Sequence, residues 1–248
     1  MTGLRIEREG DVLRVTLAKP ERRNAFDAAL IAELHEVFSD VGDARVVVLA
    51  GDGPSFCAGA DVEWQRASID LDFEENVADA LRLYRMMEAV DACPAPVVAR
   101  VRGFALGGGS GLVACSDIVV AAPGATFGFT EVRLGIIPAV ISPFVFAKIG
   151  TGTVRRFFLT GERFDATTAQ RIGLVQEVAD DVDAAVERFV AEILKSGPEA
   201  TRAAKRLARE HRSEGEELAR IAAGLRSSDE GQEGLRAFLD KRNPRWIR

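Results

Sequence analysis

The chain has 248 residues, of which 47% are hydrophobic and 28% are charged, a composition typical of a soluble globular protein with a large core. A net charge of -6 argues against a general nucleic-acid surface, and three cysteines with no CxxC pair argue against a zinc site. No stretch has the pattern of a signal peptide or reaches the roughly 20 apolar residues of a membrane span. We therefore expect a cytoplasmic protein that binds neither metal, nucleic acid nor membrane.

Short apolar segments alternate with helical patterns over the first three quarters of the chain. Alternating apolar and polar residues on both sides of Gly10-Asp11 predict a β-hairpin at 4–9 and 12–18. Continuous apolar runs are typical of strands buried on both faces, and they occur at 45–50, 97–101 and 118–122. Helical spacing predicts a helix capped by Asp27 and further helices at 70–92, 142–159 and 165–172, before a last strand at 174–179. This alternation indicates an α/β fold with parallel pairing.

The last quarter has a different composition. From about Asp183 to Lys241, alanine, glutamate, arginine and leucine recur at helical spacing, with breaks at 196–198 and 227–228. The pattern predicts a core over residues 1–182 and a helical region over 183–248. We expect this region to pack on its own core or on a neighbouring subunit.

Two glycine-bearing loops, SFCAGAD at 55–61 and ALGGGSG at 105–111, each follow a predicted buried strand. If the strands are neighbours, both loops lie at the same sheet edge, where α/β proteins bind ligands. Main-chain N–H groups from both loops can then stabilise negative charge on one ligand oxygen. Tight turning without a ligand explains either loop alone equally well. Neither GxGxxG nor GxxxxGK[ST] occurs, which argues against nucleotide-binding folds.

A serine–histidine triad is also disfavoured. Ser110 follows the three glycines, but only two histidines, His35 and His211, occur, and neither is near it in the sequence. Cys57 and Cys115 have apolar neighbours and are expected in the core rather than as nucleophiles.

Several segments together resemble the enoyl-CoA hydratase/isomerase (crotonase) family. They are SFCAGADVEW, GFALGGGSGLVACSDIVVAAPGATFGFTEVRLGIIP and FLTGERFDATTAQRIGLVQEV, with KPERRNAFD near the start and EGLRAFLDKR near the end. The resemblance implies a spiral core of ββα units and a helical C-terminal region that builds homotrimers, often paired as hexamers. It implies an acyl-CoA substrate and no cofactor apart from the coenzyme A of that thioester. The backbone N–H groups of Ala60 and Gly108 match the family's oxyanion hole, which stabilises an enolate.

The carboxylates of the family decide the reaction. Its hydratases generally use two glutamates, but the first position is Gly111 here, and only the second, Glu131, is present. Glu131 is therefore the predicted acid/base, with a helix-terminal cap as the alternative role. A single carboxylate also suits an enoyl-CoA isomerase, and a non-catalytic acyl-CoA-binding homologue is a third alternative.

Within the family the motifs most resemble bacterial methylglutaconyl-CoA hydratases, which implies reversible hydration of 3-methylglutaconyl-CoA to 3-hydroxy-3-methylglutaryl-CoA in leucine breakdown. We hypothesise that Gly111 leaves volume for the branched chain and removes a charge that would repel the distal carboxylate. Arg133 is predicted to pair with that carboxylate, with a surface ion pair as the alternative. Ser142 either orients water or caps the helix that begins at Pro143. Trp64 either lines the acyl pocket or packs in the core.

The resemblance also implies where coenzyme A is bound. Basic residues near the start and end of the chain would meet its phosphates, with Arg242 as the alternative to Lys241. One aromatic side chain would cover the adenine from a neighbouring subunit, and Asp61 would also cap the helix that follows it. The predicted contacts are Arg22, Arg23, Ala25, Ala58, Asp61, Phe238 and Lys241.

Overall fold

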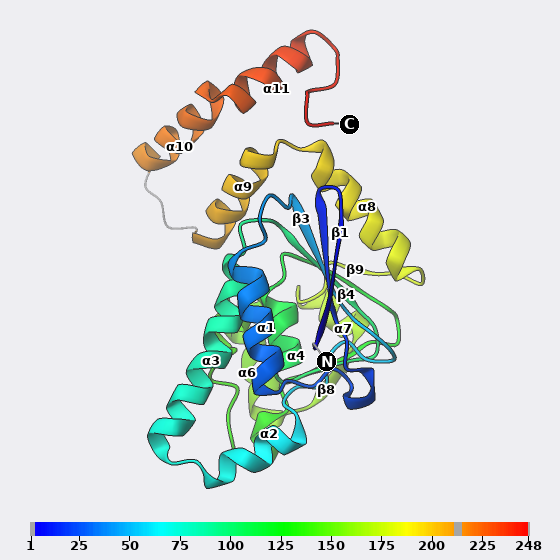
Figure 1. Cartoon of the computed structure of the whole chain (residues 1–248), viewed down its shortest axis with the longest axis vertical. Helices are drawn as coiled ribbons and strands as arrows, with labels where there is room; N and C mark the ends of the chain where they lie inside the picture. Colours follow the sequence, from blue (N-terminus) through cyan, green and yellow to red (C-terminus); the bar gives the residue numbers. More distant parts are fainter. Residues whose placement is uncertain (1–2, 211–214, 248) are drawn as a thin grey trace.

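The computed structural model describes residues 3–210 and 215–247, so His211 lies outside the described residues. Its centre is a six-stranded sheet in the order β1-β2-β3-β4-β6-β9 (Figure 1). β1 pairs antiparallel with β2, and every later pair is parallel, which confirms the predicted hairpin and the α/β topology. The strands are β1 (Leu4–Glu9), β2 (Val12–Leu17), β3 (Val46–Gly51), β4 (Val97–Val101), β6 (Ile118–Ala121) and β9 (Glu177–Val178).

Helices cover both faces of this sheet, because its central strands are apolar on both sides. Val47 and Leu49 of β3 face a core shared with α1 (Ala28–Ser39), α3 (Phe73–Ala92) and α4 (Gly108–Cys115). Val46 and Val48 face α8 (Val182–Lys195). The predicted cap is confirmed, since the Asp27 side chain accepts a hydrogen bond from the Leu30 N–H at 2.8 Å.

A smaller sheet carries the segments that build the site. β5 (Phe104–Leu106) pairs parallel with β7 (Thr126–Gly128), which pairs antiparallel with β8 (Arg163–Asp165). Buried phenylalanines pack around it, with the Phe157 and Phe164 ring centroids 4.3 Å apart. The triple glycine follows β5 directly, and Glu131 comes three residues after β7.

Two predicted elements differ in the structure. The helix predicted at 142–159 is two helices, α5 (Ser142–Ile149) and α6 (Thr151–Thr160), because Gly150 has φ 75° and ends the first. The strand predicted at 174–179 is reduced to β9. The N–H groups of Leu174 and Val175 instead donate to the Ala169 carbonyl, which extends the end of α7 (Ala166–Arg171).

The C-terminal region is helical, with breaks where they were predicted. After α8 come α9 (Pro198–Glu210), α10 (Gly215–Ser227) and α11 (Asp229–Leu239). The Glu230 carboxylate accepts the N–H groups of Glu199 and Ala200, so α11 caps the start of α9. Figure 1 shows α10 and α11 beyond α9, at the end of the molecule opposite α2. The division at 182/183 stays a prediction, since α8 packs against the sheet of the core.

Across 3–210 and 215–247, no helix combines the length and apolarity that crossing a bilayer requires. Within the same ranges, no group of three or more histidine, cysteine, aspartate or glutamate side chains is arranged to hold a metal ion.

Candidate active site

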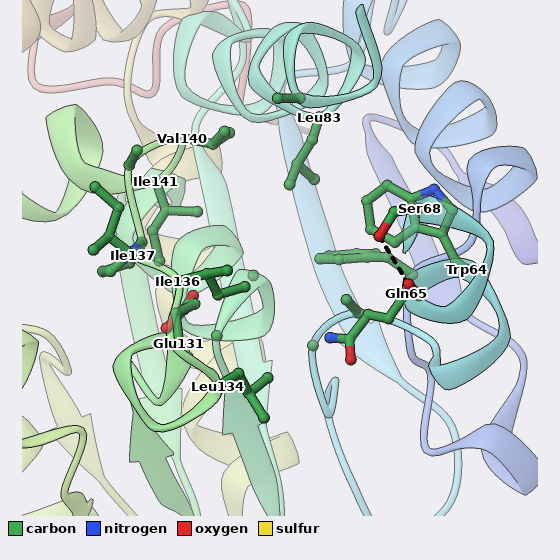
Figure 2. Close-up of a pocket in the computed structure, with 18 of the residues that line it drawn as sticks. Trp64, Gln65, Ser68, Leu83, Glu131, Leu134, Ile136, Ile137, Val140 and Ile141 are labelled. Atoms are coloured by element: carbon green, nitrogen blue, oxygen red, sulfur yellow. Dashed lines mark hydrogen bonds between the residues drawn. The ribbon is translucent and has the colours of Figure 1, made fainter. Parts of the chain in front are cut away.

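The candidate site is a cavity of about 370 Å³ between the two glycine loops and α3. Figure 2 shows its two sides, with Glu131, Ile136, Ile137 and Ile141 facing Trp64, Gln65 and Ser68. Trp64 and Gln65 belong to α2 (Val62–Ala67), and Ser68 begins the short 3-10 helix Ser68–Asp70. The lining is mostly apolar with a few polar groups, as is usual for a small-molecule site.

The first glycine loop leaves one backbone donor free. Ala60 forms a bridge with Phe26, in which the Phe26 N–H donates to Gly59 O and the Asp61 N–H donates to Phe26 O, both at 2.8 Å. No hydrogen bond from the Ala60 N–H itself occurs within the described chain. Because the bonds on either side fix the loop, this N–H is held at the cavity wall.

The second loop packs directly on the first. Gly107 has φ 51°, which favours glycine, and its N–H donates to Gly128 O at 2.8 Å. A Cβ on Gly109 would lie 2.4 Å from Cys57 O, so only glycine permits this approach. Gly108 begins α4, lines the cavity, and has an N–H that makes no hydrogen bond in the described part of the chain. The fold thus brings Ala60 and Gly108 to one cavity, as predicted, while their role as oxyanion donors stays a prediction.

Glu131 is the carboxylate that accompanies these donors. It begins the 3-10 helix Glu131–Leu134, and its Oε1 would lie 3.2 Å from a Cβ on Gly107. Oε2 is buried without a hydrogen-bond partner in the described chain. Burial raises the pKa of this carboxyl above 4.5, and its own backbone N–H only partly offsets the effect. A desolvated, unpaired carboxylate at a cavity is suited to proton transfer.

The hypothesis that Gly111 leaves free volume is wrong. Gly111 is buried in α4, and a Cβ there would lie 2.5 Å from Ile141 Cγ2 and 3.0 Å from Met87 Cε. Ile141 fills the space in which a glutamate side chain would start. It also lines the cavity, whereas Gly111 does not. An apolar side chain therefore fills the space beside Gly111, the position at which the resemblance places the first glutamate of the two-glutamate hydratases.

Asp61 and Trp64 connect the first loop to α2. Asp61 Oδ1 accepts the N–H groups of Glu63 and Trp64 at 2.9 and 3.3 Å, which confirms the predicted cap. Its Oδ2 lies 3.3 Å from Arg22 Nη1. Trp64 lines the cavity and also packs against the core, while its contact with an acyl chain stays a prediction.

The other predicted coenzyme A contacts near the start surround the same loop. Ala58 lines the cavity and donates its N–H to Arg23 O at 3.0 Å. Arg22 and Arg23 are exposed, and Ala25 is buried. Their contacts with coenzyme A, and that of Asp61, stay predictions.

Arg133 and Ser142 do not reach the cavity. Arg133 is exposed and turned toward Gly161, where a Cβ would lie 3.0 Å from its Cγ. Ser142 Oγ donates to Ala139 O at 2.8 Å and makes no capping bond, because the turn at 139–142 draws the side chain back. The cap predicted for Ser142 is therefore wrong, and neither residue lines the cavity.

Phe238 lies near the end of α11 and Lys241 beyond it. Figure 1 shows α11 at the end of the molecule opposite α2, the helix whose Trp64 and Gln65 line the cavity. Phe238 is 80% exposed. Arg242, the alternative to Lys241, pairs with Glu233 at 2.7 Å. If Phe238 and Lys241 bind coenzyme A, it is that of a neighbouring chain.

Ser110, Cys57 and Cys115, for which a nucleophilic role was disfavoured, are buried as expected. Ser110 is buried and donates to Ala105 O at 2.6 Å. Cys57 and Cys115 are buried, and burial raises the pKa of the Cys57 thiol to about 12.

Sequence reasoning missed the polar wall of the cavity. Asn76 and Asp79 of α3 line it, whereas the apolar Val77 and Leu81 of the same helix are 45% and 42% exposed. The first half of α3 covers the cavity rather than the core, so its inward positions need not be apolar. The helical spacing of 76, 79, 80 and 83 was the available signal.

Comparison with known proteins identifies the family. The family model described as enoyl-CoA hydratase/isomerase matches residues 7–248. Cyclohexa-1,5-dienecarbonyl-CoA hydratase of Thauera aromatica is 32% identical, covering 97% of this chain and 95% of the relative. Crotonyl-CoA hydratase of Syntrophomonas wolfei is 31% identical, covering 98% and 96%. An enoyl-CoA hydratase crystal structure from Shewanella pealeana has a TM-score of 0.93 and 38% identity, covering 98% of this chain and 96% of that chain.

The chain therefore belongs to the enoyl-CoA hydratase/isomerase family and has the crotonase fold. It is an enzyme of the hydratase type, a carbon–oxygen lyase.

Proposed function

We propose that this protein adds water reversibly to 2-enoyl-CoA thioesters with Glu131 as its one acid/base. The observation that carries the proposal is the unpaired, buried Oε2 of Glu131 in a cavity that also holds the free N–H groups of Ala60 and Gly108. Two donors polarise the thioester carbonyl, and a carboxylate moves the proton.

In the hydration direction, Glu131 takes a proton from water while the water oxygen bonds to C3. The electron pair of the C2=C3 bond moves toward the thioester carbonyl, and the resulting enolate oxygen accepts the N–H groups of Ala60 and Gly108. Glu131 then returns its proton to C2, and the hydroxyacyl thioester forms. Dehydration is the reverse sequence. Since one carboxylate performs both transfers, oxygen and hydrogen are added to the same face of the double bond.

The cavity supports one part of the hypothesis that the substrate is 3-methylglutaconyl-CoA of leucine breakdown, namely the branched acyl chain, but not its distal carboxylate. The apolar residues Ile137, Val140 and Ile141 suit a branched acyl chain. However, Arg133 lies outside the cavity, and no lysine or arginine of residues 3–210 and 215–247 lines it. The cavity thus supports a neutral acyl chain better than a dicarboxylic one.

A turnover screen tests both levels of the proposal. Crotonyl-CoA, 3-methylglutaconyl-CoA and a 3-enoyl-CoA are given to the wild type, to Glu131→Gln, and to Glu74→Gln, a control in the exposed first turn of α3. We expect hydroxyacyl-CoA products, a rate about 10²–10⁴-fold lower for Glu131→Gln, and no change for Glu74→Gln. An isomerase would convert the 3-enoyl-CoA to a 2-enoyl-CoA without any hydroxyacyl-CoA. Wild-type rates with Glu131→Gln would refute the role of Glu131 and leave an acyl-CoA-binding protein as the alternative.

We also propose that the active form is a homotrimer or a hexamer built as a dimer of trimers. Leu235, Phe238 and Leu239 of α11 are 47%, 80% and 75% exposed, and such apolar area on a projecting helix suits a subunit contact. Sedimentation at several concentrations tests this. A monomer throughout would refute the proposal and the predicted roles of Phe238 and Lys241 in a neighbouring site.

A further inference from the structure

Ser110 is a buried hydroxyl beside the reacting groups that has no part in the proposed reaction. It is the third residue of α4, two positions after Gly108, and is 0% exposed. It does not line the cavity, so it cannot touch a substrate bound there. Because burying a hydroxyl costs free energy unless it is hydrogen-bonded, its partners indicate its role.

The partners of Ser110 lie on β5 and β7. Its Oγ donates to Ala105 O at 2.6 Å and accepts the Gly128 N–H at 3.3 Å. Gly128 O, 3.2 Å from the same Oγ, also accepts the Gly107 N–H at 2.8 Å. The first turn of α4, which carries the predicted oxyanion donor Gly108, is therefore bonded to both strands by a side chain as well as by its backbone.

The strand that accepts the Ser110 hydrogen is also bonded to the first glycine loop. Ala105 forms a parallel bridge with Cys57. The Cys57 N–H donates to Phe104 O at 2.9 Å, and the Leu106 N–H donates to Cys57 O at 3.0 Å. The loop that continues to Ala60 thus has a fixed place beside β5, and the contact of Ser110 with β5 relates α4 to this loop.

The second strand leads directly to Glu131. Phe129, which follows Gly128, is fully buried, and its ring centroid lies 5.1 Å from that of Phe158. Glu131 comes two residues later, and its Oε1 would lie 3.2 Å from a Cβ on Gly107. The carboxylate therefore lies against the turn that Ser110 bonds to β7.

We propose that Ser110 is a positioning residue that sets the distance between the oxyanion donors and the Glu131 carboxylate. It does so by bonding the first turn of α4 to the ends of β5 and β7, without touching the substrate. The proposal rests on the proposed hydratase function and deepens it. Since a displacement of about 1 Å at reacting groups can cost about 10²-fold in rate, loss of this contact should slow the chemical step rather than weaken binding.

The test measures kcat and KM for crotonyl-CoA in Ser110→Ala and in the matched control Ser116→Ala. Ser116 follows the last residue of α4, is 1% exposed and donates to Leu112 O at 2.9 Å, about 12 Å along the helix from Gly108. We expect kcat to fall at least about tenfold in Ser110→Ala, with KM changed less than about twofold. Ser116→Ala removes an equally buried hydroxyl and should keep the wild-type kcat.

A second background separates positioning from a general loss of structure. In Gly108→Ala the added Cβ would lie 2.7 Å from Phe26 Cε2, so the turn is already displaced. Adding Ser110→Ala to this variant should lower kcat less than about threefold, because both changes act on the same turn. Ser110→Cys keeps a weak donor and acceptor, so its kcat should lie between those of Ser110→Ala and the wild type. It also carries the test if Ser110→Ala does not fold by circular dichroism.

Three results would overturn the inference. One is a folded Ser110→Ala or Ser110→Cys variant with the wild-type kcat. Another is an equal fall in kcat for Ser116→Ala, which would show that any buried hydroxyl of α4 has this effect. The third is the same factor of loss for Ser110→Ala in the wild type and in Gly108→Ala, which would show an action independent of the turn. Absence of crotonyl-CoA hydration by the wild type would instead refute the proposed function itself, so the two failures are distinguishable.

Discussion

The contact between Gly111 and Ile141 predicts strong energetic coupling between two positions 30 residues apart. A methyl group added at Gly111 would lie 2.5 Å from Ile141 Cγ2 and 3.1 Å from its Cβ. Both residues are buried, at 2% exposure for Ile141, so neither can move into solvent. The double-mutant cycle of Gly111→Ala and Ile141→Ala isolates this contact.

The size of the coupling follows from the stability change that Gly111→Ala causes in the wild type and in the Ile141→Ala variant. Overpacking at a buried site costs about 1–3 kcal/mol, while glycine to alanine inside a helix gains about 0.5–1 kcal/mol. We therefore expect Gly111→Ala to destabilise the wild type by up to about 2.5 kcal/mol. Ile141→Ala removes Cγ2 and costs about 2–5 kcal/mol alone. In that background the added methyl group fills space and keeps its helix gain, so Gly111→Ala should be neutral or stabilising.

Urea unfolding followed by circular dichroism measures the four free energies. All four proteins are compared at one concentration, because subunit assembly would contribute to stability. The expected coupling is at least about 1 kcal/mol in favour of the double variant. Additivity within about 0.5 kcal/mol would refute the statement that Ile141 occupies the place of the missing glutamate.

Three further predictions concern the reacting groups. The raised pKa means that the folded protein holds the Glu131 proton more tightly than the unfolded chain, so stability falls as the pH rises from 4.5 through that pKa. Glu131→Gln should thus raise the Tm at about pH 8 but not at about pH 4, and an equal effect at both would contradict this. Hydration requires the ionised carboxylate of Glu131, so kcat/KM for crotonyl-CoA should fall at low pH with a midpoint above 4.5. A midpoint at or below 4.5 would count against Glu131 as the base. A Cβ on Gly108 would lie 2.7 Å from Phe26 Cε2 and displace the turn, so Gly108→Ala should lower kcat/KM about 10²-fold. The double variant Gly108→Ala/Phe26→Leu should recover part of this loss, because the smaller side chain relieves the clash. Equal losses in both variants would argue against the steric cause.

The central fold could be predicted from the sequence because its apolar strand patterns are compatible with few other topologies. The valine runs of β3, β4 and β6 must be buried on both faces, which requires a parallel sheet between helices. The topology predicted that the two glycine loops lie at one sheet edge, and the family resemblance then identified Ala60 and Gly108 within them. Asp27 and Asp61 were predicted as caps because capping depends on residues only two or three positions away.

The errors concern contacts between distant segments. Whether Gly111 leaves a space depends on Ile141, and nothing in the local sequence shows that the two meet. Helical spacing continued through Gly150, although that residue has a positive φ and separates α5 from α6. On α3, periodicity identified a helix but not that the face bearing Asp79 borders a cavity rather than the core. These are tertiary effects, which local patterns do not encode.

The bond between Gly107 and Gly128 has a consequence for how such an enzyme diversifies. Gly128 O accepts the Gly107 N–H, and Gly128 N–H donates to Ser110 Oγ at 3.3 Å, so the end of β7 holds the turn of Gly108 just before the chain reaches Glu131. The predicted oxyanion donor Gly108 and the proposed proton carrier Glu131 are therefore joined by one hydrogen-bonded turn. The α2 part of the opposite wall continues directly from the loop that carries Ala60, whereas the α3 part is attached elsewhere in the chain. Substitutions on α3 can therefore change which acyl chain is accepted without moving the reacting groups, so substrate range can evolve while the reaction is inherited unchanged.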